Sequence, residues 1–221
     1  MKSLTPVHDP SQRGSNCKGT PYLNSAQTQS SGNISNENNC ALFITGIPVA
    51  IPFSEIFDEI TDGAVRALSV KPPGTFNTSA AKLVFFSPQG AQSFFSRAHA
   101  GTGISLREST LNVTYNRGGY LQYCPDNIAI RVLFLEGPSN IMTWQYWKPF
   151  FDQACSYQLD RWIMHPCSNP NRRGMEVRFV RVDGQAQACF QIIVKDKTNK
   201  DWIDILVGYG LDPCESAAWR P

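Results

Sequence analysis

The sequence predicts an α+β protein made of two small domains, each with the element order β-α-β-β-α-β. The first observation is a repeat: Leu-Phe-Ile-Thr-Gly-Ile-Pro at residues 42–48 returns as Leu-Phe-Leu-Glu-Gly-Pro at residues 133–138, an offset of 91 residues. This offset is too long for a solenoid repeat and suits a small domain. The second observation is that similar strand and helix patterns follow each copy. We therefore expect one small fold used twice.

The first half contains four short apolar runs and two helical patterns. A run at residues 41–45, cut off by Gly46 and Pro48, suits a buried strand better than a helix. Further strands are expected at residues 65–70, 80–85 and 111–115. Apolar residues spaced i, i+3, i+4, i+7 mark two helical faces. The first face consists of Phe53, Ile56, Phe57 and Ile60, and the second of Ala91, Phe94, Phe95 and Ala98. Pro52 precedes the first face, and Ser87 with Pro88 is a capping sequence for the second.

The second half repeats this order. Strands are expected at residues 130–136, 158–164, 176–182 and 203–209, with a loop at residues 166–174. An aromatic group marks the first helical region, within which Pro149 is expected to start a fresh helix. The second helix is marked by Ala186, Cys189, Phe190 and Ile193. Each half thus predicts the ferredoxin-like split βαβ arrangement, a four-stranded antiparallel sheet backed by two helices.

Composition shifts divide the chain into five segments. Residues 1–39 hold too few apolar residues to offset the entropy of ordering, which predicts a disordered tail. The first domain is expected at residues 40–116 and the second at residues 128–214. A linker at residues 117–127 contains Gly118, Gly119 and Pro125, and residues 215–221 form a short C-terminal tail.

Charge and cysteine content limit the function classes. Among 221 residues, 20 Lys and Arg nearly balance 18 Asp and Glu, so no strong net charge draws the chain to a polyanion. Seven cysteines, an odd number without a Cys-x-x-Cys pair, favour free reduced thiols over a disulfide framework. No apolar run approaches a membrane span and no signal region is seen, so we expect a soluble, intracellular protein of the nucleus or cytoplasm.

Catalytic and metal-binding patterns are weak. His165 and Cys167 offer two potential metal ligands, but nothing near them in the sequence completes a set of four. We find no Gly-rich phosphate loop and no nucleophile motif. The sequence therefore predicts a protein that is not an enzyme and has no metal or other cofactor.

The two halves resemble the RNA recognition motif (RRM), in which two helices back a four-stranded sheet that binds RNA. The best local match is residues 42–47, where Gly46 stands in place of the family's usual Asn. The resemblance covers residues 40–116 well and residues 128–214 more loosely. Residues 207–214 also resemble the tails of divergent RRM-like proteins of filamentous fungi.

The third strand of each half departs from the family, which places two base-stacking aromatics there. If Ala81, Leu83 and Phe85 point into the core, Ala80 and Lys82 point outward. In the second half, inward Met175, Val177 and Phe179 leave Glu176, Arg178 and Val180 outward. Neither strand then carries a platform aromatic, although a register error of one residue would exchange the two sets.

The resemblance implies a set of candidate RNA-binding residues on the sheets and in the loop before the third strand of the second half. They are Phe43, Thr45, Lys82, Phe134, Arg172, Arg173 and Arg178, with Arg181 nearby. An outward Phe can stack on a base, and Arg suits phosphate. The alternatives are that a helix, the other domain or a partner covers the Phe rings, and that Asp183 and Glu176 make the arginines an ordinary solvated surface.

Two functions remain open at this point. The first is non-catalytic binding of single-stranded RNA; the second is a protein-interaction module that uses the same fold without RNA. An aromatic group, expected mainly in the core, could also place some rings against the first domain or a partner. This group is Trp144, Trp147, Phe150 and Phe151. The sequence predicts no oligomeric state.

Overall fold

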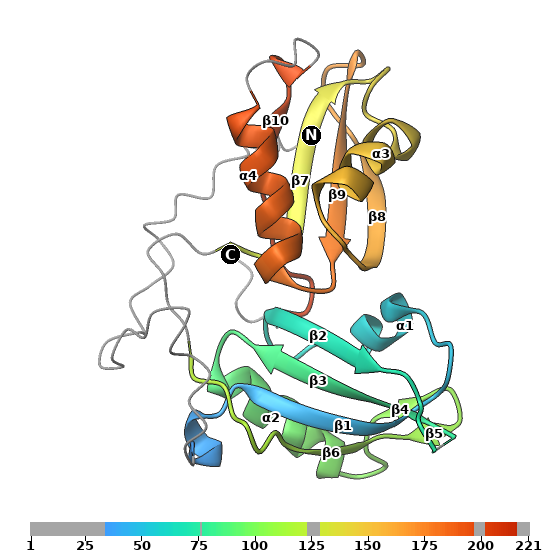
Figure 1. The fold of residues 1–221 in the computed structure, drawn as a ribbon, viewed down its shortest axis with the longest axis vertical. Helices are drawn as coiled ribbons and strands as arrows, with labels where there is room; N and C mark the ends of the chain where they lie inside the picture. Colours follow the sequence, from blue (N-terminus) through green and yellow to red (C-terminus); the bar gives the residue numbers. More distant parts are fainter. Residues whose placement is uncertain (1–33, 76, 123–128, 197–201, 216–221) are drawn as a thin grey trace.

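A computed structural model describes residues 34–75, 77–122, 129–196 and 202–215, and these form two four-stranded antiparallel sheets, each backed by two helices (Figure 1). The strand orders are β2-β3-β1-β6 in the first sheet and β10-β7-β9-β8 in the second. In both sheets, the first and third strands in chain order are central: β1 and β3 in the first sheet, and β7 and β9 in the second. The second and fourth strands lie at the edges. The predicted α+β class and the twofold use of one arrangement are confirmed.

The first sheet follows the predicted element order closely. Its elements are β1 (Ala41–Ile47), α1 (Phe53–Asp58), β2 (Val65–Lys71), β3 (Ser79–Phe85), α2 (Pro88–His99) and β6 (Asn112–Tyr115). Ser87 caps α2, because its hydroxyl oxygen accepts a hydrogen bond from the Gly90 amide at 3.2 Å. A small hairpin of β4 (Ser105–Leu106) and β5 (Ser109–Thr110) precedes β6 and was not predicted.

The second sheet contains β7 (Val132–Pro138), β8 (Leu159–Pro166), β9 (Arg172–Phe179) and β10 (Leu206–Tyr209), with helices α3 (Trp144–Ala154) and α4 (Gln187–Lys195). A π-helical turn, η3 (Val182–Ala186), leads into α4. The loop predicted at residues 166–174 is shorter than expected, because β9 begins at Arg172, where it pairs with the end of β7. The last strand also begins later than predicted.

The prediction that Pro149 starts a fresh helix is wrong. Helix α3 runs through Pro149 without interruption. Trp147 and Phe151, on either side of the proline, are both fully buried in the core of the second half. Burial of two large aromatic side chains favours the continuous helix by more than the loss of one backbone hydrogen bond opposes it. The other two aromatics of the group, Trp144 and Phe150, pack against the same core.

The predicted strand parity is correct in both halves. Ala81, Leu83 and Phe85 of β3 are buried in the first core, and Met175, Val177 and Phe179 of β9 are buried in the second. Val180, predicted to point outward, is instead buried and belongs to the first core. It reaches that core because it lies at the junction between the halves, where its carbonyl accepts a 2.9 Å hydrogen bond from Leu68 of β2.

Segments near the predicted domain boundaries take part in packing. Cys214, at the end of the expected second domain, lies in the first core, and its carbonyl accepts a hydrogen bond from Gly63. A short 3-10 helix, η2 (Asn36–Asn38), precedes Asn39, which is 2% exposed. The described residues do not include residues 1–33 of the predicted tail, residues 123–127 of the linker or residues 216–221 at the end of the chain. The division into two domains stays a prediction.

Five of the seven cysteines are described, and all five are free thiols: Cys40, Cys155, Cys167, Cys189 and Cys214. The Cys155 and Cys189 sulfur atoms are 3.6 Å apart. Cys17 and Cys124 lie outside the described residues. None of the helices in the described ranges has the length and apolar character needed to span a membrane.

Candidate nucleic-acid interface

The open face of the first sheet presents one aromatic side chain at its centre. Alternation along β1 sends Leu42 and Ile44 into the core and Phe43 to the opposite face, where it is 36% exposed. Phe43 stands opposite Lys82 of β3 and Thr114 of β6. Three of the predicted site residues, Phe43, Thr45 and Lys82, therefore share one surface.

Polar groups flank Phe43 along the strands. Thr45 lies two residues further along β1, opposite Asn112 of β6 and Ala80 of β3. Asn112 and Thr114 are exposed, and Thr45 is half-buried. Hydroxyl and amide groups of this kind can donate and accept hydrogen bonds at base edges. The face thus combines an aromatic ring with hydrogen-bonding side chains.

Tyr120, in the segment that follows β6, covers the other end of this face. It packs against the small apolar cluster of Cys40, Ala41 and Val84. Asn39 holds the segment in place, because its side-chain oxygen accepts hydrogen bonds from the amides of Tyr120 at 3.0 Å and Ala41 at 2.9 Å. The face around Phe43 is therefore bounded on one side by an aromatic residue from outside the sheet.

Two cations lie against the Tyr120 ring. The Lys82 ammonium nitrogen is 5.7 Å from the ring centroid, and the Arg66 guanidinium carbon is 5.2 Å from it. Burial lowers the pKa of Lys82 from its ordinary value. Arg66 also forms a 2.9 Å ion pair with Asp183 of the second half. Lys82 is the cation directly opposite Phe43.

Phe134 occupies the corresponding position in the second sheet. It is half-buried, stands opposite Glu176 of β9, and its ring lies 5.8 Å from the His165 ring. The ring covers Gly174, where an added Cβ atom would lie only 2.6 Å from the end of the Phe134 ring. The glycine therefore gives this ring the space to lie against the sheet.

The predicted arginines do not form one cluster. Arg172 pairs with Glu136 at 2.8 Å, and Arg178 pairs with Glu176, which also contacts His165 at 3.2 Å. Arg172 and Arg178 lie six residues apart on β9, or about 20 Å along an extended strand.

The other two arginines differ in their surroundings. Arg173 is exposed and has no ion pair with another described residue. Arg181 reaches the first half, where it donates a 3.3 Å hydrogen bond to the Ser69 hydroxyl.

His165 and Cys167 do not come together with further metal ligands in the part of the chain that the structure describes. No group of three or more His, Cys, Asp or Glu there is arranged to hold a metal ion.

A buried ionic network at the junction of the halves was not found by sequence reasoning. Arg131, which is 0% exposed, donates hydrogen bonds to Asp212 and Asp160 and lies 3.9 Å from the centroid of the Phe57 ring. The only signal in the sequence was a charged residue inside the apolar run that leads into β7. This network positions the two halves and is not itself accessible to a ligand.

No family model matches the sequence, and no curated protein is significantly similar to it. Among solved structures, RNA recognition domains 1 and 2 of Sex-lethal from Drosophila melanogaster match with 16% identity and a TM-score of 0.30, covering 78% of this chain and 100% of that one. The first two RRM domains of the yeast poly(U)-binding protein Pub1 match with 13% identity and a TM-score of 0.31, covering 77% and 99%. RRM domains 1 and 2 of Prp24 from S. cerevisiae match with 11% identity and a TM-score of 0.34, covering 78% and 96%.

Both halves of the chain are RRM-like in element order and strand order. In each, the outer strands are the fourth and the second, the central strands are the first and the third, and two helices cover one face. The open face is the one that carries Phe43 in the first half and Phe134 in the second.

Proposed function

We propose that this chain binds single-stranded RNA without catalysis, chiefly through the open face of the first sheet. The observation that carries the proposal is the position of Phe43, an exposed ring at the centre of an open RRM-like sheet and opposite Lys82. Stacking of one base on an aromatic side chain is worth about 1–3 kcal/mol. Lys82 supplies a cation for the neighbouring phosphate, and Thr45 supplies a hydroxyl for a base edge.

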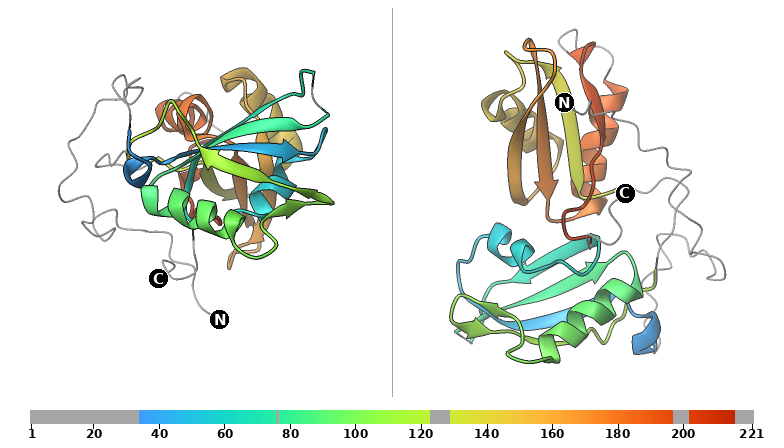
Figure 2. Two further views of the ribbon diagram at one scale, coloured as in Figure 1. Left: turned by 90° about the horizontal axis from the view of Figure 1, so that it is seen from below. Right: turned by 180° about the vertical axis from the view of Figure 1, so that it is seen from behind.

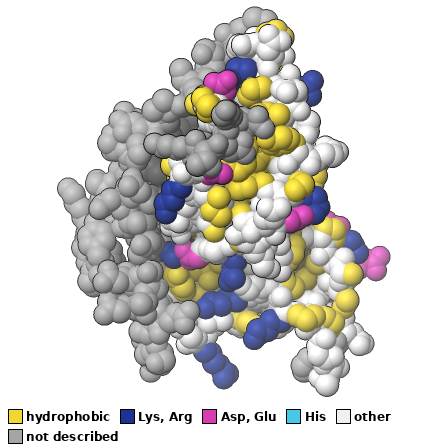
Figure 3. All heavy atoms as spheres, turned by 45° about the horizontal axis from the view of Figure 1, so that its top comes forward, with side chains coloured by type: hydrophobic (Ala, Val, Ile, Leu, Met, Phe, Trp, Pro, Cys, Tyr) yellow, Lys and Arg dark blue, Asp and Glu magenta, His cyan; other side chains and the backbone are white. Residues whose placement is uncertain are grey.

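Affinity is expected to be modest because β3 presents no aromatic residue on the open face. Ala80, Lys82 and Val84 occupy its outward positions and Phe85 is buried in the core, so Phe43 is the one ring from the strands of this face. Lys and Arg side chains gather over the first half in Figure 3 (Figure 3). This distribution supports a contribution from phosphate contacts although the net charge of the whole chain is only +2.

The second half is expected to contribute weaker contacts through two separate residues. Phe134 lies on its open face, whereas strand alternation places Arg173 on the other face at the start of β9, next to the loop before this strand. Arg172 and Arg178 already pair with Glu136 and Glu176, so a phosphate must compete with a carboxylate for each of them. Arg173 has no such competitor among the described residues.

The test is a titration of labelled, mixed-sequence single-stranded RNA at several salt concentrations. Phe43→Leu removes the stacking face and keeps an apolar side chain of similar size. Trp162→Leu is the matched control, because Trp162 is 41% exposed but points to the helical side of the second sheet. Loss of affinity in the first variant alone supports the proposal, whereas equal affinity in both variants and the parent rules out the Phe43 face.

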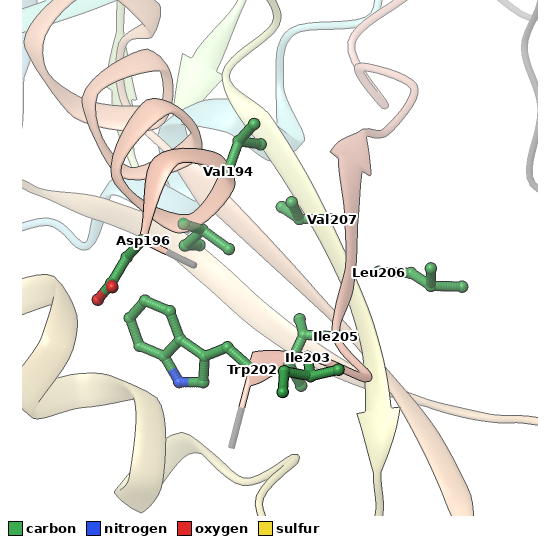
Figure 4. Close-up of a pocket in the computed structure, with 8 residues that line it drawn as sticks. Val194, Asp196, Trp202, Ile203, Ile205, Leu206 and Val207 are labelled. Atoms are coloured by element: carbon green, nitrogen blue, oxygen red, sulfur yellow. The ribbon is translucent and has the colours of Figure 1, made fainter. Parts of the chain in front are cut away.

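A second candidate function is binding of a partner protein at an apolar groove of the second half. The groove has a volume of about 490 Å³ and lies between the end of α4 and β10 (Figure 4). Its rim exposes Ile203, at 75%, and Leu206, at 56%. Exposed apolar side chains grouped in this way are typical of protein-binding surfaces. Ile203→Asp would abolish such binding and leave RNA affinity unchanged, because Ile203 precedes β10 and is not on the sheet face that carries Phe134, which separates the two functions.

A further inference from the structure

The two open sheet faces point to opposite sides of the molecule. In Figure 1, α3 and α4 lie in front of the second sheet, whereas α2 lies behind the first sheet. The view from behind in Figure 2 shows the reverse order (Figure 2). The faces that carry Phe43 and Phe134 are therefore not the two walls of one cleft.

Contacts across the junction agree with this arrangement. Arg161 lies opposite Arg178 on the open side of the second sheet. Its guanidinium donates hydrogen bonds to the Ser54 carbonyl at 2.9 Å and to Asp58 at 2.6 Å, both in α1, which packs on the helical side of the first sheet. The open side of one half thus continues into the helical side of the other.

The reverse contact occurs on the other side of the molecule. Arg181 lies immediately before the turn that leads into helix α4, and its guanidinium donates a hydrogen bond to the Ser69 hydroxyl. Ser69 stands opposite Lys82, and Lys82 stands opposite Phe43, so all three share the open face of the first sheet. Two independent contacts therefore assign opposite directions to the two open faces.

Buried contacts hold this orientation. Asp212 accepts hydrogen bonds from Arg131 of the second half and, at 2.8 Å, from the Val65 amide of the first half. The Leu68 amide of β2 donates a hydrogen bond to the Val180 carbonyl. The side chains of Val180 and Cys214 are buried in the first core. A junction with a buried ion pair and shared core residues restrains domain motion, which is otherwise expected between linked domains.

We propose that the two open faces are two separate RNA sites, so that one protein carries two single-stranded segments on opposite sides. This inference rests on the proposed function. One RRM-type face stacks two or three bases, so a short strand can contact only one of the two faces. A single RNA reaches both faces only if the stretch between the bound segments is long enough to pass around the edge of the molecule.

The experiment uses two oligonucleotides of about four nucleotides each, joined by a flexible polyethylene glycol spacer of increasing length. With the full chain, a short spacer should give the affinity of a single oligonucleotide. Affinity should then rise once the spacer can pass around the molecule, because the second contact becomes intramolecular. A cleft would instead give the highest affinity with the shortest spacers.

Two variants identify the sites. Phe43→Ala and Phe134→Ala should each abolish the gain at long spacer lengths and leave the binding of one oligonucleotide at the other face. A gain with the shortest spacer, or no gain at any length, overturns the inference, and the proposed function still stands if Phe43→Ala weakens binding. Failure of every RNA to bind the parent chain overturns the proposed function itself.

Discussion

Arg131 and Asp212 form a buried bidentate ion pair at the junction of the two halves. Arg131 Nε lies 3.0 Å from Asp212 Oδ2, and Nη2 lies 2.8 Å from Oδ1. Both side chains are 0% exposed. Burial by itself lowers the pKa of Arg131, but the negative charge of Asp212 raises it above its ordinary value. Because Asp212 also accepts the Val65 amide, one carboxylate links the second half to the start of β2.

We predict that Asp212→Ala strongly destabilises the protein. The substitution leaves the Arg131 charge buried with one carboxylate in place of two, and it removes the acceptor of the Val65 and Cys214 amides. Removal of one partner from a buried ion pair costs about 3–5 kcal/mol. The measurement is the free energy of unfolding in urea.

Glu55→Ala is the matched control for this prediction. Glu55 forms a bidentate pair with Arg107, with the same geometry as the buried pair, but both side chains are well exposed. Solvent screening makes such a pair nearly neutral for stability, so the control should unfold like the parent. Equal stability of Asp212→Ala and the parent would contradict the importance of the network.

We predict that Phe43→Ala weakens RNA binding without unfolding the protein. The ring is 36% exposed, so its loss removes a stacking face together with part of its packing on the sheet, and we expect a modest loss of stability but no unfolding. Affinity should fall by about 1–3 kcal/mol, with an unchanged dependence on salt because no charge is removed. Phe43→Tyr retains the ring and should bind nearly as well as the parent. A large drop in melting temperature for Phe43→Ala would mean that the ring is needed for packing.

We predict that Arg173 contributes more to phosphate binding than Arg172. Arg173 is exposed and has no ion pair with another described residue, whereas Arg172 already pairs with Glu136. Arg173→Ala should therefore flatten the logarithmic dependence of affinity on salt by about 0.7, the value for one contact to a single strand. Arg172→Ala should change this slope less. Equal flattening of the slope by both variants would contradict this prediction and would mean that Glu136 releases Arg172 when RNA binds. A slope equal to that of the parent in both variants would mean that neither arginine contacts phosphate.

Sequence periodicity predicted most of the fold because apolar alternation and helical spacing are local signals. The parity of β3 and β9 followed from which side chains could enter a core, and the structure confirms it. The continuity of α3 could not be predicted in this way. A proline usually interrupts a helix, and only tertiary burial of Trp147 and Phe151 overrides that preference.

The candidate site was predictable only in part. The outward direction of Phe43 follows from strand alternation, which is local. Tyr120 reaches the same face from the segment after β6, and Asp212 reaches Arg131 across 81 residues of sequence. The pairing of Arg172 with Glu136 depends likewise on the register between β7 and β9. Such contacts depend on tertiary structure, and no periodic pattern in a single sequence carries them.

We predict that the stability of the protein falls in alkaline solution, in part because of Cys40. This thiol is 0% exposed, and burial raises its pKa from 9.0 to about 12, against a smaller opposite effect of Arg66. Between these two pH values the unfolded chain loses the proton while the folded protein keeps it. The stabilising contribution is therefore complete below pH 9 and is lost as the pH rises toward 12.

The measurement for Cys40 is the free energy of unfolding in urea, followed from neutral pH to pH values above 9. Cys40→Ala removes the titrating group from a fully buried position, so its stability should fall less steeply with pH than that of the parent. Burial also raises the pKa of Cys189 and Cys214, so some alkaline dependence should remain in the variant. Cys167→Ala is the control, because Cys167 is more exposed than Cys40 and should change the slope less. Identical slopes for Cys40→Ala and the parent would show that the Cys40 thiol titrates alike in the folded and unfolded chains.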